Sequence, residues 1–296
     1  MAPLRSSPEG IGNSLIESEG DSVKESSRKN QPTLKDKAAK ETFEWIKAFG
    51  YAVIAVLIIR LFVFETMMVP TGSMIPAIVP GDRLFVERIT FQAREPDYGE
   101  IVVFWTPFID QQASEMLGPF DRFMDFFSPA EFRGHVKYVK RLVGKPGDIL
   151  EMIPNGVGTG YHLSINGVIP NRLEEIVYQI DGIFTDPSYY KKMAYPSSFR
   201  LRDSEQNFFM YYNRVLDYAT YYKRYLDDIP VEEYAWTNSD TLRVQVRIPE
   251  GFYFFVGDNS PASLDSRFFG FVPVENVVGG PLLRFWPFPR FGTLHQ

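Results

Sequence analysis

Residues 136–144, VKYVKRLVG, give the clearest indication of a β-strand in the sequence. The stretch is rich in β-branched residues and ends at the turn-forming run KPGD, 145–148, a pattern typical of a strand entering a turn. Alternate residues of a strand share a face, so Lys140 lies on the face of Tyr138 and Leu142. A lysine in apolar surroundings has a depressed pKa and can act as a neutral base. The ordinary alternative is a strand lysine whose amine reaches solvent.

Segments on both sides of this strand have the same character. Apolar or alternating runs bounded by turn residues predict strands at 84–89, 100–105, 148–153, 161–167, 241–249 and 251–258. Helical patches occur around Met116 and at 120–127, and residues 171–235 are Tyr-rich, charged and partly helical in period. We therefore predict a mostly β fold with a partly helical insertion.

An apolar run, AFGYAVIAVLIIRLFVF, occupies residues 48–64 and contains one charge, Arg60. A membrane-spanning helix needs about 20 apolar residues, with a lower limit near 17. The alternative is a buried core helix. However, the run is apolar on all sides rather than striped, and Arg60 lies where a long side chain can reach the headgroups. We predict a single transmembrane anchor at 44–66.

Residues 1–43 combine seven serines with mixed charges and no apolar period, a composition typical of a disordered tail. Four lysines lie between residues 35 and 47, within the range over which the positive-inside rule counts charges. The first basic residue after the anchor is Arg83. The tail is therefore expected in the cytoplasm and the rest of the chain on the exported face.

Composition excludes several classes of protein. Cysteine is absent, which excludes disulfides, thiolate metal sites and a cysteine nucleophile. Three histidines disfavour a multi-histidine metal site, and a net charge of −6 disfavours a general nucleic-acid binder. We expect no metal, no cofactor and no nucleic-acid partner. The 26 Phe, 16 Tyr and 4 Trp suit a folded chain with apolar or peptide-binding surface.

Two further segments carry polar groups on constrained backbone. Residues 69–76, VPTGSMIP, place Ser73 between glycine and methionine, where prolines keep the chain out of a helix. Residues 257–267, GDNSPASLDSR, follow an apolar strand and are dense in small hydroxyls and carboxylates. Taken alone, each segment reads as an ordinary turn.

The set of motifs is far more specific than any one of them. PTGSMIP with GDRLFVER, then KYVKRLVGKPGD, then GDNSPASLDSRFFGFVP, occur in this order behind an anchor, and the chain thereby resembles the type I signal peptidases (leader peptidases) of bacteria. The resemblance covers 45–106, 136–170 and 241–292. It implies a signal-peptidase-like catalytic β domain in two parts, 67–170 (with an insertion at 107–134) and 241–296, separated by an insertion or cap region at 171–240.

The resemblance implies a serine endopeptidase that removes N-terminal signal peptides from exported preproteins through an acyl-enzyme. Ser73 would attack the scissile carbonyl, and a neutral Lys140 would take and return the proton. The Thr71 hydroxyl and the Ser73 backbone N–H would form the oxyanion hole, and Ser263 would orient the lysine. The competing Lys137 lies on the opposite strand face, and a solvated lysine is protonated at neutral pH.

The resemblance also assigns supporting residues. Asp258, Asp265 and Arg267 correspond to an ionic network beneath the site. Pro261, and the absence of the usual charged pair after Asn259, are departures from the family pattern.

The signal peptides of this family's substrates end in small residues, typically Ala-x-Ala, and small apolar-lined pockets exclude larger side chains by clash. An extended substrate would lie between the strand before Ser73 and the strand of Lys140. By resemblance, the pockets are lined by Met67, Val69, Met74, Ile78, Tyr138 and Val139.

These inferences together describe a single-pass protein of the bacterial inner (cytoplasmic) membrane, with its N-terminus in the cytoplasm and its catalytic domain on the exported face. Preprotein signal peptides and the lipid bilayer are the expected partners, and we expect a monomer. Ser73 follows Phe64 by nine residues, so the nucleophile lies within about 30 Å of the membrane surface.

Two alternatives belong to other classes. A penicillin-binding or β-lactamase-type acyltransferase would need Ser-x-x-Lys, which occurs at 26–29 and 188–191, but neither Ser-Asp-Asn nor Lys-Thr-Gly accompanies it. The other alternative is a catalytically inactive, membrane-anchored binding module of the same fold. The presence of Ser73, Thr71, Lys140 and Ser263 together argues against it.

Overall fold

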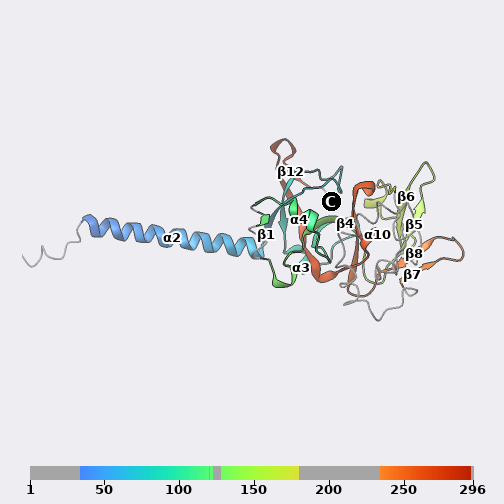
Figure 1. The fold of residues 1–296 in the computed structure, drawn as a ribbon, viewed down its shortest axis with the longest axis horizontal. Helices are drawn as coiled ribbons and strands as arrows, with labels where there is room; N and C mark the ends of the chain where they lie inside the picture. The colour runs from blue at the N-terminus through green and yellow to red at the C-terminus, as the bar shows by residue number, and fades with distance from the viewer. Residues whose placement is uncertain (1–33, 120, 123–127, 180–233, 295–296) are drawn as a thin grey trace, which may run out of the picture. The chain divides into compact units, whose positions relative to one another are not determined.

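The computed structural model describes residues 34–119, 121–122, 128–179 and 234–294 (Figure 1). The chain divides into two compact units after Ile58. Three sequence predictions lie wholly or mostly outside the described residues: the disordered tail, the helical patch at 120–127, and the body of the insertion at 171–240.

A long helix, α2 (Leu34–Phe62), opens the described chain and contains most of the predicted apolar run. Its first half is rich in Ala, Lys, Glu and Leu, which are strong helix formers. The helix ends four residues before the predicted end of the anchor, because Phe64 already begins the first strand. Within the described part of the chain, no helix combines the length and apolar character needed to cross a membrane. The transmembrane anchor stays a prediction.

An antiparallel sheet of eight strands forms the larger part of the second unit. Its strands are β1 (Phe64–Met68), β2 (Arg83–Glu87), β3 (Ile101–Trp105), β4 (Lys137–Gly144), β9 (Phe252–Val256), β10 (Val272–Pro273), β11 (Val277–Trp286) and β12 (Gly292–Thr293). The order is β1-β2-β11-β3-β4-β9-β10, with β12 paired to β11. The strands predicted at 84–89, 100–105, 136–144 and 251–258 correspond to β2, β3, β4 and β9, so these predictions are confirmed.

A smaller antiparallel sheet has the order β6-β5-β8-β7. It consists of β5 (Ile149–Pro154), β6 (Tyr161–Ile165), β7 (Ala235–Thr237) and β8 (Val244–Arg247). The strands predicted at 148–153, 161–167 and 241–249 are thus also present. With two antiparallel sheets, the mostly β prediction is confirmed.

Short helices connect the strands. They are α3 (Thr90–Ala93), α4 (Gln111–Glu115) and α10 (Ser266–Phe269), with 3₁₀ turns at η1 (Ala130–Phe132), η2 (Asn171–Leu173), η6 (Ser260–Ala262), η7 (Val274–Asn276) and η8 (Phe288–Arg290). Met116, the centre of one predicted helical patch, lies just beyond α4.

Strand β11 was not predicted from the sequence. Glycine and proline in a strand interior normally argue against a strand, and β11 contains Gly279, Gly280 and Pro281. The structure explains Gly279, because a Cβ there would lie 1.8 Å from the carbonyl oxygen of Glu87. Two backbones approach too closely for any side chain, and β11 can therefore pair with both β2 and β3.

Strand β3 divides the core into two clusters. All five of its residues are buried, and alternate residues point to opposite faces. Val102 and Phe104 join a cluster that includes Leu142, whereas Val103 and Trp105 join a second that includes Val139. The Phe104 ring stacks on Phe255 of β9, with centroids 4.2 Å apart. Strand β4, the neighbour of β3, is therefore held between two apolar layers.

Truncating the stacked ring tests this core. Phe255→Ala removes a fully buried side chain, and we expect a loss of about 3–5 kcal/mol in the free energy of unfolding. Phe288→Ala, at a residue that is 71% exposed, is the matched control and should change stability by no more than about 0.5 kcal/mol. Urea unfolding measures both variants. Equal losses would contradict the assignment of Phe255 to the core.

Candidate active site

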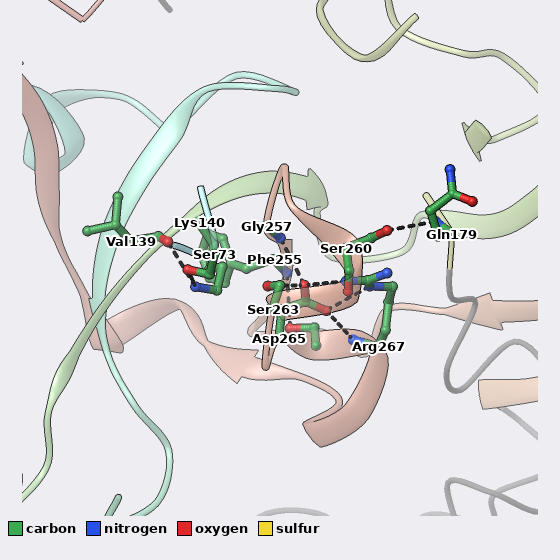
Figure 2. A network of polar contacts seen from close by, with 11 residues as sticks. Ser73, Val139, Lys140, Gln179, Phe255, Gly257, Ser260, Ser263, Asp265 and Arg267 are labelled. Atoms are coloured by element: carbon green, nitrogen blue, oxygen red, sulfur yellow. Dashed lines mark hydrogen bonds and ion pairs between the residues drawn. The ribbon is translucent and has the colours of Figure 1, made fainter. Parts of the chain in front are cut away.

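Ser73 and Lys140 lie together although 67 residues separate them in the chain (Figure 2). Lys140 lies in the middle of β4, and Ser73 lies in the turn region between β1 and β2. The Lys140 Nζ and Ser73 Oγ are 2.6 Å apart, and the two residues are 3% and 6% exposed. The geometry allows a proton to pass directly between the hydroxyl and the amine.

The surroundings of Lys140 favour its neutral form. Burial lowers the pKa of the ammonium group to about 8, against the opposing pull of Asp265 and Asp258 and with a small contribution from Arg267. Its Nζ has two hydrogen-bond partners in the described part of the chain, Ser73 Oγ and the Val139 carbonyl at 3.1 Å. Neither partner is a carboxylate, so the amine makes no direct ion pair that would hold its proton.

Asp265 and Arg267 form a fully buried ion pair behind the serine. Arg267 Nη2 and Nε donate to the two carboxylate oxygens at 2.8 and 2.9 Å. The same carboxylate accepts from the Gly257 N–H at 2.9 Å and from the Ser263 hydroxyl at 2.5 Å. A buried charge pair is tolerated only when its hydrogen-bonding capacity is satisfied. This pair therefore fixes the shape of the 257–267 loop.

Asp258 belongs to a separate ion pair. Arg141 of β4 donates to both of its carboxylate oxygens, at 2.7 and 3.0 Å, and also to the Gly99 carbonyl at 2.7 Å. The resemblance indicated one network with Asp265 and Arg267. The structure instead has two pairs, and sequence reasoning missed Arg141 as the partner of Asp258.

Ser263 lies beside the site but does not contact Lys140 through a hydrogen bond. In the view of Figure 2, it lies between the Ser73–Lys140 pair and Arg267. Its hydroxyl donates to Asp265 instead, because a carboxylate is a stronger acceptor than an amine. A Cβ on Gly257 would lie 2.3 Å from Ser263 Oγ and 2.6 Å from the Ser73 carbonyl oxygen. Ser263 is therefore close to the nucleophile's backbone, and its orienting role stays a prediction.

Asn259 was not singled out from the sequence. Its backbone N–H donates to the Ser73 carbonyl at 3.0 Å, and its side-chain amide donates to the Gly72 carbonyl at 3.0 Å. One asparagine thus binds both carbonyls next to the nucleophile. The contact spans 187 positions in the chain, and local sequence gives no signal for such a pairing.

A cavity of about 210 Å³ opens at the Ser73–Lys140 pair. Thr71 and five of the six predicted pocket residues line it: Met67, Val69, Met74, Tyr138 and Val139. Ile78 is the exception. It is fully buried in the core cluster of Met74 and Val139, so its place in a substrate pocket stays a prediction. Its apolar side chain supports the pocket wall from behind.

The first insertion supplies a wall that was not predicted. Asp110, Ala113, Met116, Leu117 and Asp121 also line the cavity. The Tyr138 hydroxyl donates to the buried carboxylate of Asp110 at 2.5 Å, and the same carboxylate accepts from the Ala113 N–H at the start of α4. Asp110 thereby fixes both the tyrosine and the helix at the cavity edge.

Lys137, the competing lysine, has partners of its own. Its amine forms an ion pair with Glu65 of β1 and lies 4.1 Å from the centre of the Trp105 ring. Lys137 lines the same cavity but is not hydrogen-bonded to Ser73.

Within the described ranges, no group of three or more His, Asp or Glu side chains could hold a metal ion.

Comparisons with known proteins identify a family for the chain. The family model described as signal peptidase, peptidase S26, matches residues 42–286. Signal peptidase I of Leptolyngbya laminosa is 26% identical over 94% of this chain and 97% of its own. Probable signal peptidase I-2 of Synechocystis is 28% identical over 88% of this chain and 83% of its own. For signal peptidase I of Aquifex aeolicus the identity is 28%, over 77% of each chain.

The structure is a β fold with a buried serine–lysine pair at a cavity. Because the family model matches most of the chain, the chain belongs to the peptidase S26 family. Its relatives are bacterial type I signal peptidases, and the chain is accordingly a hydrolase of the signal peptidase I type.

The titration of Lys140 gives a test of the pair. If Lys140 is the base of Ser73, the serine is activated only when the lysine is neutral. Acylation of Ser73 by a serine-reactive inhibitor should then accelerate about tenfold per pH unit and level off near the pKa of about 8. The measurement is the acylation rate between about pH 6 and pH 10. Lys137→Ala should leave the midpoint unchanged. A rate independent of pH below 8 would contradict the assignment.

Proposed function

We propose that this protein is a membrane-anchored signal peptidase that cleaves exported preproteins with a Ser73–Lys140 dyad, after small residues of the Ala-x-Ala type. The observation that carries the proposal is the buried contact of 2.6 Å between Ser73 Oγ and Lys140 Nζ. The lowered pKa of the lysine supports its use as a base near neutral pH.

The proposed reaction has two steps. Lys140 Nζ accepts the Ser73 hydroxyl proton while Oγ forms a bond to the scissile carbonyl carbon. The resulting ammonium then gives that proton to the leaving amine as the C–N bond breaks, which leaves an acyl-enzyme. In the second step Lys140 takes a proton from water while the water oxygen forms a bond to the ester carbon. The C–Oγ bond then breaks, the proton returns to Ser73 Oγ, and the signal peptide leaves with a new C-terminal carboxylate.

The oxyanion of each step needs hydrogen-bond donors. The proposed donors are the Ser73 backbone N–H and the Thr71 hydroxyl, which lies at the cavity two residues earlier. Loss of one such donor typically lowers the rate about 10²–10³-fold. Ser263, whose hydroxyl is held by Asp265, is the proposed lysine-orienting residue.

Strand β1 supports the proposed mode of substrate binding. In the part of the chain that the structure describes, β1 pairs with β2 on one side and ends the sheet. An edge strand offers backbone groups to an extended peptide, and Met67 and Val69 place apolar side chains at the cavity. A peptide with small side chains would fit between this edge and Tyr138 and Val139 of β4, whereas larger ones would clash.

The proposed location is the bacterial inner membrane, with the N-terminus in the cytoplasm and the catalytic domain on the exported face. The support comes from the apolar run at 48–64, the lysines before it, and the short connection from Phe64 to Ser73. Preprotein signal peptides and the bilayer are the proposed partners of a monomeric enzyme.

Cleavage of a purified preprotein with an Ala-x-Ala site, in detergent, tests the dyad. Ser73→Ala and Lys140→Ala should each lower kcat at least about 10³-fold, because each removes a group that acts on the reacting atoms. Lys137→Ala is the control and should stay active, since its partners are Glu65 and Trp105.

Activity that survives Ser73→Ala would refute the nucleophile. A wild-type chain that binds the signal peptide but neither cleaves it nor reacts with a serine-directed inhibitor would instead establish the inactive binding module.

Charges within the apolar run test the anchor. Ile54→Arg with Ala55→Arg should release the protein from membranes under an alkaline carbonate wash, because each arginine costs about 2.5–3.5 kcal/mol at the centre of a span. Val157→Arg with Leu242→Arg, at exposed positions of the second unit, is the control and should stay in the pellet. Wild-type protein that washes off would refute the anchor.

A further inference from the structure

We infer that Asn259 is a positioning residue: it holds the Gly72–Ser73 peptide plane so that the Ser73 N–H faces the oxyanion. The inference rests on the proposed function, which uses that N–H as an oxyanion donor. It deepens that function by assigning a role to an asparagine outside the dyad and the oxyanion hole.

One peptide group connects the Asn259 side chain to the Ser73 N–H. The Gly72 carbonyl and the Ser73 N–H belong to the same planar, trans unit, so they point in opposite directions. The direction of the carbonyl oxygen therefore determines the direction of the N–H. Asn259 Nδ2 donates to that oxygen at 3.0 Å, and the side-chain amide thereby controls a donor that it does not touch.

A second bond holds the following peptide group. The backbone N–H of Asn259 donates to the Ser73 carbonyl at 3.0 Å. Both carbonyls that flank the Ser73 Cα are thus bound to one residue, so rotation about either backbone bond of Ser73 would break a contact. Gly72 has the largest conformational freedom of any residue type, which makes an external restraint at this position effective.

Asn259 is itself held in place. Its carbonyl accepts from the Ala262 N–H at 3.0 Å, and the preceding residue, Asp258, forms the two-oxygen ion pair with Arg141 of β4. The strand that carries Lys140 is therefore connected through Arg141 and Asp258 to the residue that holds Ser73. Base and oxyanion donor are placed relative to one another by this connection.

Asn259 is one of two hydrogen-bond donors to the Gly72 carbonyl. The Ile75 N–H also donates to the Gly72 carbonyl, at 3.2 Å, and this bond remains when Asn259 is replaced. Loss of the side-chain amide should therefore loosen the oxyanion donor without abolishing it. The expected loss is about 10–100-fold, below the 10²–10³-fold loss typical for complete removal of a donor.

The test compares Asn259→Ala and Asn259→Asp with wild type in cleavage of an Ala-x-Ala preprotein. In Asn259→Asp a carboxylate oxygen faces the Gly72 carbonyl and repels it, so this variant should be the slower of the two. We expect kcat to fall by about 10–100-fold with KM within about twofold. Asn238→Asp is the matched control, because Asn238 accepts turn N–H groups through its Oδ1 and a carboxylate can do the same.

Two further readouts separate positioning from a merely structural role. A peptide aldehyde adds to Ser73 Oγ and places its oxygen in the oxyanion position, so its affinity should fall in parallel with kcat/KM. In Asn259→Ala the midpoint of the pH profile should stay at the wild-type value, because this change adds no charge and does not touch the Lys140 amine. Thermal unfolding checks that each variant is folded under the assay conditions.

Each outcome decides a specific point. Variants that cleave within twofold of wild type, or that lose activity without losing aldehyde affinity, would overturn the inference. A shifted pH midpoint in the uncharged variant Asn259→Ala would overturn it as well. Failure of the proposed function has a different signature, in which wild-type protein does not cleave or Ser73→Ala stays active.

Discussion

The burial of the Lys140 amine beside Ser73 is the constraint on which the site depends. A lysine ammonium is costly to bury without a counter-charge, and the group responds by giving up its proton more readily. The β4 strand imposes this burial, because it lies between β3 and β9 in the sheet and packs against both core clusters. The apolar core that stabilises the fold is thus also what lowers the pKa of the base.

The charges near Lys140 are arranged so that they do not undo this effect. An isolated carboxylate at Asp265 would raise the pKa of the amine, and Arg267 acts in the opposite direction. Because the two form a fully buried pair, the carboxylate can organise the 257–267 loop while its charge is largely compensated. Asp258 forms an ion pair with Arg141. Two ion pairs therefore hold the loop, and neither carboxylate is hydrogen-bonded to the Lys140 amine.

The parts of this structure that could be predicted from the sequence are those encoded by neighbouring residues. Apolar or alternating runs bounded by turn residues predicted seven strands. The strand pattern of 136–144 placed Lys140 on an apolar face and so indicated this lysine without any knowledge of its contact with Ser73. Strand β11 was not predicted, because Gly279 is needed where two backbones approach closely, and this approach exists only in the folded sheet. Ile78 was placed in the pocket because an apolar residue near a site is equally suited to the core behind it.

The contacts that sequence reasoning missed share a physical cause. Arg141 pairs with Asp258 across 117 positions, and Asn259 binds Gly72 across 187. Such pairs depend on the order of strands in the sheet, which local patterns do not encode. The family resemblance gave Ser73 and Lys140 their roles, but it could not show that Ser263 donates to Asp265 or that the first insertion supplies Asp110 to hold Tyr138.

Strand β1 connects helix α2 to the cavity and to the segment that carries Ser73. It begins two residues after α2 ends, its edge borders the cavity, and the chain that leaves it carries Thr71 and Ser73. Glu65, near its start, pairs with Lys137 of β4, so the two strands that border the cavity are connected at the end remote from Ser73. At the other end, the pairing of Lys140 with Ser73 connects them again. A peptide lying between these strands would be aligned with Ser73, the proposed nucleophile, by the same two strands that place Lys140, the proposed base.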